Sequence, residues 1–101
     1  MKPKNGMRAI HPGEVLQEEF LSPFGMSATR LAQLLAVPPN RMTELVAKRR
    51  SITADTALRL ARALGASAEF WMNLQKSYEL RTAKIELGST LKSIKPLRIA
   101  G

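Results

Sequence analysis

The 101-residue sequence has no cysteine and only one histidine, His11. Without thiols the chain can build neither a disulfide framework nor a thiolate metal site, and one histidine does not supply a set of metal ligands. No apolar run of roughly 18 residues is present, and the first residues lack the apolar segment of a secretory signal. We therefore expect a cytoplasmic protein that binds no metal and does not enter a membrane.

Catalytic patterns are also absent. The sequence has no glycine-rich phosphate loop, no nucleophile elbow and no histidine placed to activate a serine. Glu18 and Glu19 are adjacent, so on a helix they would point about 100° apart, which does not suit an acid and a base that share one substrate. We expect a protein that is not an enzyme, takes no small-molecule substrate and needs no cofactor; a hydrolase is the alternative that these absences disfavour.

Negative charge is scarce. The chain has 16 Lys and Arg against 8 Asp and Glu, a formal net charge of +8. Residues 26–62 carry most of the imbalance, with basic side chains opposed only by Glu44 and Asp55, whereas residues 13–25 carry glutamates and no basic residue. This balance favours polyanions such as nucleic acid as partners, although an anionic membrane surface or the ribosome would suit the same charge.

Apolar residues recur at helical spacing up to about Arg81, and no strand alternation precedes residue 84. Pro12 opens the first predicted helix, with His11 as its cap, and Pro23 and Gly25 end it. The four helices that follow open, in chain order, at Ser27, Pro38-Pro39, Thr53 and Ser67. We predict an all-α domain over residues 11–81, between a flexible basic arm at 1–10 and a tail at 82–101 that orders only on a partner.

The second and third predicted helices form a helix-turn-helix pair, joined by a tight turn at Ala36-Val37-Pro38. Such a pair inserts its second helix into the major groove of DNA while the first lies across the backbone. Met42, Leu45 and Val46 would face the core. The opposite face carries Asn40, Thr43, Glu44 and Ala47 at spacings of three and four residues.

We predict that four residues of this second helix read bases: Asn40, Arg41, Thr43 and Glu44. Asparagine suits an adenine edge, glutamate suits a cytosine amino group, and arginine suits either a guanine edge or the backbone. The alternative for Glu44 is a surface ion pair with Lys48, four residues further on.

Phosphate contacts are expected from hydroxyls and basic side chains at the two outer ends of the helix pair. These residues are Ser27, Thr29, Arg30, Lys48, Arg49 and Arg50. The alternative for residues 48–50 is a solvated run of charge. Arg59 and Arg62, on the fourth predicted helix, are expected simply to face solvent.

Trp71 and Tyr78 lie seven residues apart on one face of the fifth predicted helix. This spacing is typical of a core or a dimer interface. The competing interpretation is a platform on which unpaired bases stack, which would make the chain an RNA-binding or ribosome-binding module.

Residues 8–81 resemble the HigA-type antitoxins, also called VapI-type, of the Cro/repressor-like helix-turn-helix superfamily. The pieces that carry the resemblance are His11-Pro12-Gly13-Glu14, Asn40-Arg41, ITADTALRL at 52–60 and FWMNLQ at 70–75. Their order is much more specific than a helix-turn-helix alone. The resemblance implies a five-helix lambda-repressor-like domain with short flexible N- and C-terminal tails.

Proteins of this family form homodimers, bind palindromic double-stranded operators in the promoter of their own operon, and repress it. They also bind and restrain a HigB/RelE-like toxin, a ribosome-dependent mRNA endonuclease. Carried onto this chain, the resemblance makes Trp71, Leu74 and Tyr78 candidates for the dimer interface. The nearest alternative is a stand-alone helix-turn-helix regulator that has the same fold and no toxin partner.

Toxins of this class are basic, so a positively charged antitoxin needs a local acidic surface to receive one. Glu14, Glu18 and Glu19, on the first predicted helix, are the candidate toxin-docking residues.

Overall fold

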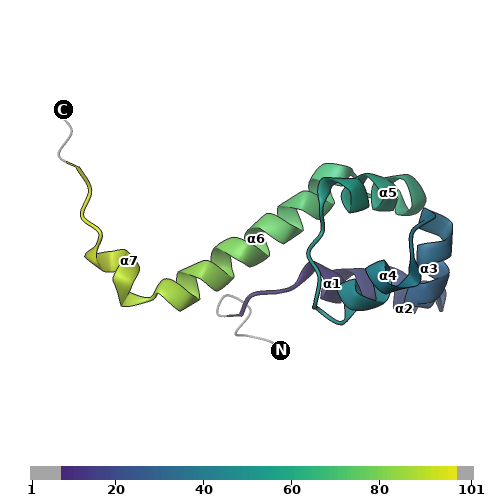
Figure 1. The fold of residues 1–101 in the computed structure, drawn as a ribbon, viewed down its shortest axis with the longest axis horizontal. Helices are drawn as coiled ribbons and strands as arrows, with labels where there is room; N and C mark the ends of the chain where they lie inside the picture. The colour runs from purple at the N-terminus through teal and green to yellow at the C-terminus, as the bar shows by residue number, and fades with distance from the viewer. Residues whose placement is uncertain (1–7, 98–101) are drawn as a thin grey trace.

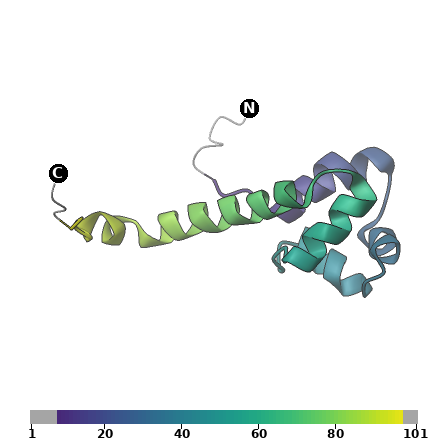
Figure 2. The same cartoon turned by 90° about the horizontal axis from the view of Figure 1, so that it is seen from above.

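The computed structural model describes residues 8–97, and all regular secondary structure in that range is helical (Figures 1 and 2). The elements are α1 (Pro12–Val15), η2 (Leu16–Leu21), α2 (Ser22–Phe24), α3 (Ala28–Leu35), α4 (Pro39–Val46), α5 (Ala54–Leu64), α6 (Ala68–Leu87) and α7 (Ser89–Ser93). Every helical segment expected from the sequence is present, so the all-α class is confirmed. Residues 1–7 of the predicted arm and residues 98–101 of the predicted tail lie outside the described range.

The first predicted helix is one continuous helical run made of α1, η2 and α2. Its middle, η2, is π-helical, and the N–H of Ser22 donates to the carbonyl of Gln17. Pro23 therefore lies inside the run, where a regular α-helix would bring its ring against the carbonyl four residues earlier. The wider π turns precede this point. The run ends at Gly25, whose φ of 61° is left-handed.

Capping side chains define the other helix starts as predicted. The hydroxyls of Ser27, Thr53 and Ser67 each accept a hydrogen bond from the backbone N–H three residues later, at 3.0, 3.4 and 3.0 Å. Pro39 is the first residue of α4, where its missing N–H costs no helical hydrogen bond. Gly65, with φ 92°, ends α5.

A single core lies between the helical run 12–24, helices α3 to α5 and the first half of α6. Its buried apolar residues are Leu16, Leu21, Leu31, Ala32, Leu35, Met42, Leu45, Ile52, Ala57, Leu60 and Trp71. The indole of Trp71 is fully buried, and the rings of Phe20 and Phe70 pack on it with centroid separations of 5.1 and 5.0 Å. This cluster fixes the start of α6 on the body of the domain.

Helix α6 continues to Leu87, so the predicted helix end near Arg81 is wrong, and the part of the predicted tail at 82–93 is helical without a partner except at Gly88. Its later residues are mostly exposed, so Leu80, Ala83 and Leu87, although at helical spacing, have no core to face. The helix ends at Gly88, with φ 51°, and the short helix α7 follows. The second half of α6 and α7 project away from the body (Figures 1 and 2), which gives the molecule extents of 54 × 32 × 21 Å.

Candidate nucleic-acid interface

Helices α3 and α4 pack on each other more extensively than any other pair of elements (Figure 1). Ala36, in the turn between them, has a left-handed φ of 59°, and its N–H donates to the carbonyls of Ala32 and Gln33. Val37 is half-buried against the core. The turn therefore reverses the chain within three residues and places α4 across α3 in the predicted helix-turn-helix arrangement.

The polar face of α4 points outward. Met42 and Leu45 are fully buried on one side, while Asn40 and Ala47 are exposed on the other. Thr43, Glu44 and Arg41 are half-buried. All four predicted base-reading residues therefore lie on α4, but only Asn40 is exposed, and the other three are half-buried.

Glu44 does not pair with Lys48, the partner that spacing alone suggested. Its Oε1 instead accepts hydrogen bonds from Nε and Nη2 of Arg50, at 3.2 and 2.8 Å. Arg50 lies beyond the end of α4 and folds back onto that helix. Both residues are half-exposed, so the ion pair contributes little to stability, but it sets the direction of the Glu44 carboxylate.

Arg41 is held by a neighbouring helix. Its Nη1 lies 2.6 Å from Oδ1 of Asp55, in the first turn of α5. The same oxygen accepts from Nε of Arg59 at 2.7 Å. The hydrogen bond from Arg59, and to a smaller extent the one from Arg41, holds the pKa of Asp55 below its ordinary value.

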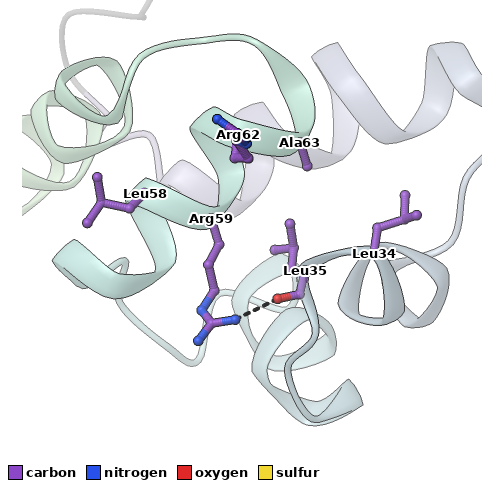
Figure 3. Close-up of a pocket in the computed structure, with 6 residues that line it drawn as sticks. All are labelled: Leu34, Leu35, Leu58, Arg59, Arg62 and Ala63. Atoms are coloured by element: carbon purple, nitrogen blue, oxygen red, sulfur yellow. Dashed lines mark hydrogen bonds between the residues drawn. The ribbon is translucent and has the colours of Figure 1, made fainter.

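Arg59 is not merely solvent-facing, and that prediction is wrong. Its Nη1 donates to the backbone carbonyl of Leu35 at 2.7 Å, at the C-terminal end of α3 (Figure 3). A guanidinium there satisfies a carbonyl that has no partner within the helix. Arg59 also borders a shallow groove between α3 and α5, whose lining is Leu34, Leu35, Leu58, Arg59, Arg62 and Ala63 (Figure 3).

A second ion-pair network lies at the exit of α4. Lys48, with a left-handed φ of 67°, places its Nζ 3.6 Å from Oε1 of Glu14. Arg8 binds the same carboxylate with two hydrogen bonds of 3.0 Å. The bond from Arg8 is the main reason that the pKa of Glu14 is lowered. Of the three candidate toxin-docking residues, Glu14 is therefore engaged within the chain, while Glu18 and Glu19 are exposed.

His11 caps α1 as predicted. Its Nδ1 accepts from the N–H of Gly13 at 2.9 Å, and its ring packs edge-on against Tyr78, with centroids 4.8 Å apart. Burial lowers the pKa of His11, and the charge of Lys48 acts in the same direction. The His11-Pro12-Gly13 segment is buried and anchors the start of α1 between α4 and α6.

The candidate phosphate contacts differ in their availability. The hydroxyl of Ser27 is used in capping α3, whereas Thr29 is exposed. Nη1 of Arg30 donates to Gln33 along the same helix, at 3.0 Å. Arg49 is exposed at the exit of α4, where its N–H donates to the carbonyl of Glu44. These residues stay candidates, at the N-terminal end of α3 and just beyond α4.

Trp71 has no surface to offer a second chain or an unpaired base, because its side chain is fully buried. This placement removes it from the candidate dimer residues and rules out its use as a stacking platform. Leu74 and Tyr78 are half-buried.

Sequence reasoning missed Gln75, whose Oε1 accepts from the N–H of Ile52 at 2.7 Å and so ties α6 to the loop before α5.

Within residues 8–97, no group of His, Asp or Glu side chains is placed to hold a metal ion. In the same range, no helix combines the length and apolar character needed to span a membrane.

The fold and the outward face of α4 define a helix-turn-helix domain of the Cro/repressor-like type. No protein-family model matches the sequence. Virulence-associated protein I of Dichelobacter nodosus is 54% identical over 81 residues, which cover 80% of this chain and 75% of that protein. Antitoxin HigA-1 of Vibrio cholerae is 34% identical over 97 residues, 96% of this chain and 91% of that protein.

A solved structure leads to the same family. The antitoxin HigA of Pseudomonas aeruginosa, determined with the higBA promoter, superimposes with a TM-score of 0.86 at 44% identity, covering 90% of this chain and all of that one. The chain belongs to the HigA family of helix-turn-helix antitoxins.

Proposed function

We propose that this chain is a dimeric antitoxin and autorepressor, which binds operator DNA in the promoter of its own operon and neutralises a RelE-like mRNA-cleaving toxin. The observation that carries the proposal is the exposed polar face of α4, held outward by the helix-turn-helix turn. The proposal is supported by a family member of the same fold, the Pseudomonas aeruginosa antitoxin HigA, whose structure was determined with the higBA promoter.

In the proposed complex, α4 enters the major groove with Asn40 and Thr43 toward base edges. The N-terminal end of α3, with Thr29 and Arg30, lies on the phosphate backbone, and Arg49 meets phosphates beyond the end of α4. The net charge of +8 supplies the attraction that does not depend on sequence.

A second copy would pack on the projecting part of α6. Leu80, Ala83, Lys84 and Leu87 recur on one face of α6, and with Leu91 of α7 they line one groove there. Leu80 and Leu87 are 65% and 43% exposed. Two copies joined at this place would present two α4 helices to a palindromic operator.

Fluorescence anisotropy tests the DNA-binding half of this proposal. The purified chain is titrated with a duplex from the promoter of its own operon and with a scrambled duplex, at two salt concentrations. We expect a preference of about 10³-fold for the promoter duplex. The double substitution Asn40→Ala with Thr43→Ala should reduce this preference. The control Asn73→Ala, at an exposed position of α6, should not. Equal, steeply salt-dependent binding to both duplexes would reduce the activity to non-specific charge attraction.

Co-expression with the toxin encoded in the same operon tests the other half. We expect Glu18→Lys with Glu19→Lys to abolish co-purification of the toxin. The matched control is Glu69→Lys with Glu86→Lys, which makes the same change of charge on exposed residues of α6. Retention of the toxin by the first variant would contradict docking on Glu18 and Glu19, and absence of any toxin complex in the wild type would favour a stand-alone regulator.

A further inference from the structure

One carboxylate links three helices around the candidate interface. Oδ1 of Asp55, in α5, lies 2.6 Å from Nη1 of Arg41 in α4 and 2.7 Å from Nε of Arg59. Arg59 in turn donates to the carbonyl of Leu35 at 2.7 Å, at the end of α3 (Figure 3). It also donates to the carbonyl of Ala36 at 3.4 Å. Arg59, bonded to the end of α3, therefore holds the carboxylate of Asp55 in place, and that carboxylate holds the side chain of Arg41.

Arg41 lies on the flank of α4, beside the outward face that carries Asn40. Its side chain is 27% exposed, while that of Asp55 is 56% exposed. The ion pair is thus accessible to a ligand that approaches α4. A guanidinium has five N–H donors, and the bond to Asp55 uses one nitrogen of Arg41, Nη1.

We propose that Asp55 is a specificity-determining residue of DNA binding, which withholds Arg41 from phosphates and directs its remaining donors toward a base edge. The inference rests on the proposed operator binding. A phosphate is present at every sequence, so an unrestrained arginine contributes equally to all duplexes. A phosphate beside Arg41 would repel the negative charge of Asp55. It would also compete with Asp55 for the N–H donors of Arg41. A guanine O6/N7 edge accepts from the outer donors without displacing that bond.

Asp55 remains an anion at neutral pH, because hydrogen bonds from Arg59 and Arg41 hold its pKa below the ordinary value. Glu44, three residues after Arg41 and therefore next to it on the surface of α4, pairs with Arg50 and not with Asp55. The restraint on Arg41 therefore depends on one side chain, which a substitution can remove without touching the outward face of α4.

Asp55→Asn provides the test, and Glu69→Gln provides its matched control. Asp55 and Glu69 are both exposed, and each lies two residues after a helix-capping hydroxyl, Thr53 and Ser67. Both substitutions remove one negative charge. Anisotropy titrations use the promoter duplex and the scrambled duplex over a series of salt concentrations, with circular dichroism to verify folding.

We expect Asp55→Asn to strengthen binding to the scrambled duplex and to steepen its salt dependence by about 0.9 in log K against log [salt], one additional phosphate contact. The preference for the promoter duplex should fall at least about ten-fold. Glu69→Gln should leave this preference unchanged, and Asp55→Glu, which keeps a carboxylate, should restore most of it. In an Arg41→Ala background, Asp55→Asn should no longer alter the preference, because Asp55 acts through Arg41.

Three results would overturn the inference. An unchanged preference in Asp55→Asn would show that the carboxylate does not govern discrimination. Equal weakening on both duplexes would leave Asp55 a structural bracket between helices. A wild-type chain that binds both duplexes equally would remove the proposed function and this inference together. The first two results concern the variant alone and leave the proposed function in place.

Discussion

Gly13 lies directly against the backbone of Leu45. A Cβ added to this glycine would sit 1.9 Å from the carbonyl oxygen of Leu45 and 3.1 Å from the Cα of Val46. Helix α1 therefore meets the last turn of α4 backbone to backbone, with no space for a side chain. This contact fixes the C-terminal end of the candidate recognition helix from behind, opposite its outward polar face.

Gly13→Ala should destabilise the domain by about 3 kcal/mol, because neither backbone can yield to the added methyl group. Urea unfolding followed by circular dichroism measures the loss. Gly25→Ala is the informative comparison, since no atom lies within 4 Å of its Cβ position and only its φ of 61° opposes the change. That variant should lose about 1 kcal/mol. Similar losses for both would contradict the close packing at Gly13.

Gln75→Leu should cost about 1–3 kcal/mol, since the N–H of Ile52 would lose its acceptor in a buried place. Gln33→Leu, at an exposed position of α3, should change stability by less than about 0.5 kcal/mol. Thermal and urea unfolding of the two variants make the comparison. Equal stability of both would mean that the bond to Ile52 contributes nothing.

Stability should fall as the pH drops below about 6.5, the ordinary pKa of histidine. Burial lowers the pKa of His11 in the folded state, so the unfolded chain takes up this proton first and is favoured by acid. Protonation also removes the Nδ1 lone pair that accepts from Gly13. Unfolding free energies at about pH 7.5 and about pH 5.5 test this above the range of Glu14, whose own pKa is lowered. His11→Asn, which keeps a capping oxygen, should remove most of the difference.

Leu80→Ser with Leu87→Ser should convert the proposed dimer to a monomer, because both leucines lie in the exposed groove on the projecting part of α6. Light scattering after size-exclusion chromatography gives the mass directly. Leu34→Ser with Leu58→Ser is the matched control, since these leucines are 50% and 63% exposed on the body of the domain. A dimer that survives the first pair but not the second would move the interface to the groove between α3 and α5.

Local chemistry explains why most of the fold could be predicted. Capping by Ser27, Thr53 and Ser67 and the start of α4 at Pro39 depend on residues within one helical turn. The outward face of α4 follows equally from its periodicity, because buried Met42 and Leu45 fix its rotation.

Contacts between distant residues could not be predicted in this way. Arg59 donates to Leu35, 24 residues earlier, and Gln75 accepts from Ile52, 23 residues earlier. Spacing within one helix gives no information about such pairs, so the sequence alone places Arg59 in solvent and gives no signal for Gln75. The pairing of Glu44 with Arg50 also depends on the chain folding back after α4.

The long α6 also has a geometric consequence for any two-fold assembly joined at its far end. An α-helix rises about 1.5 Å and turns about 100° per residue, so the 20 residues of α6 span about 30 Å. Each residue inserted between Tyr78 and Leu80 would both lengthen this arm and rotate the body around it. After such an insertion, the spacing and orientation of the two α4 helices would no longer match half-sites one turn of DNA apart. The length of α6 would then act as a ruler for operator spacing.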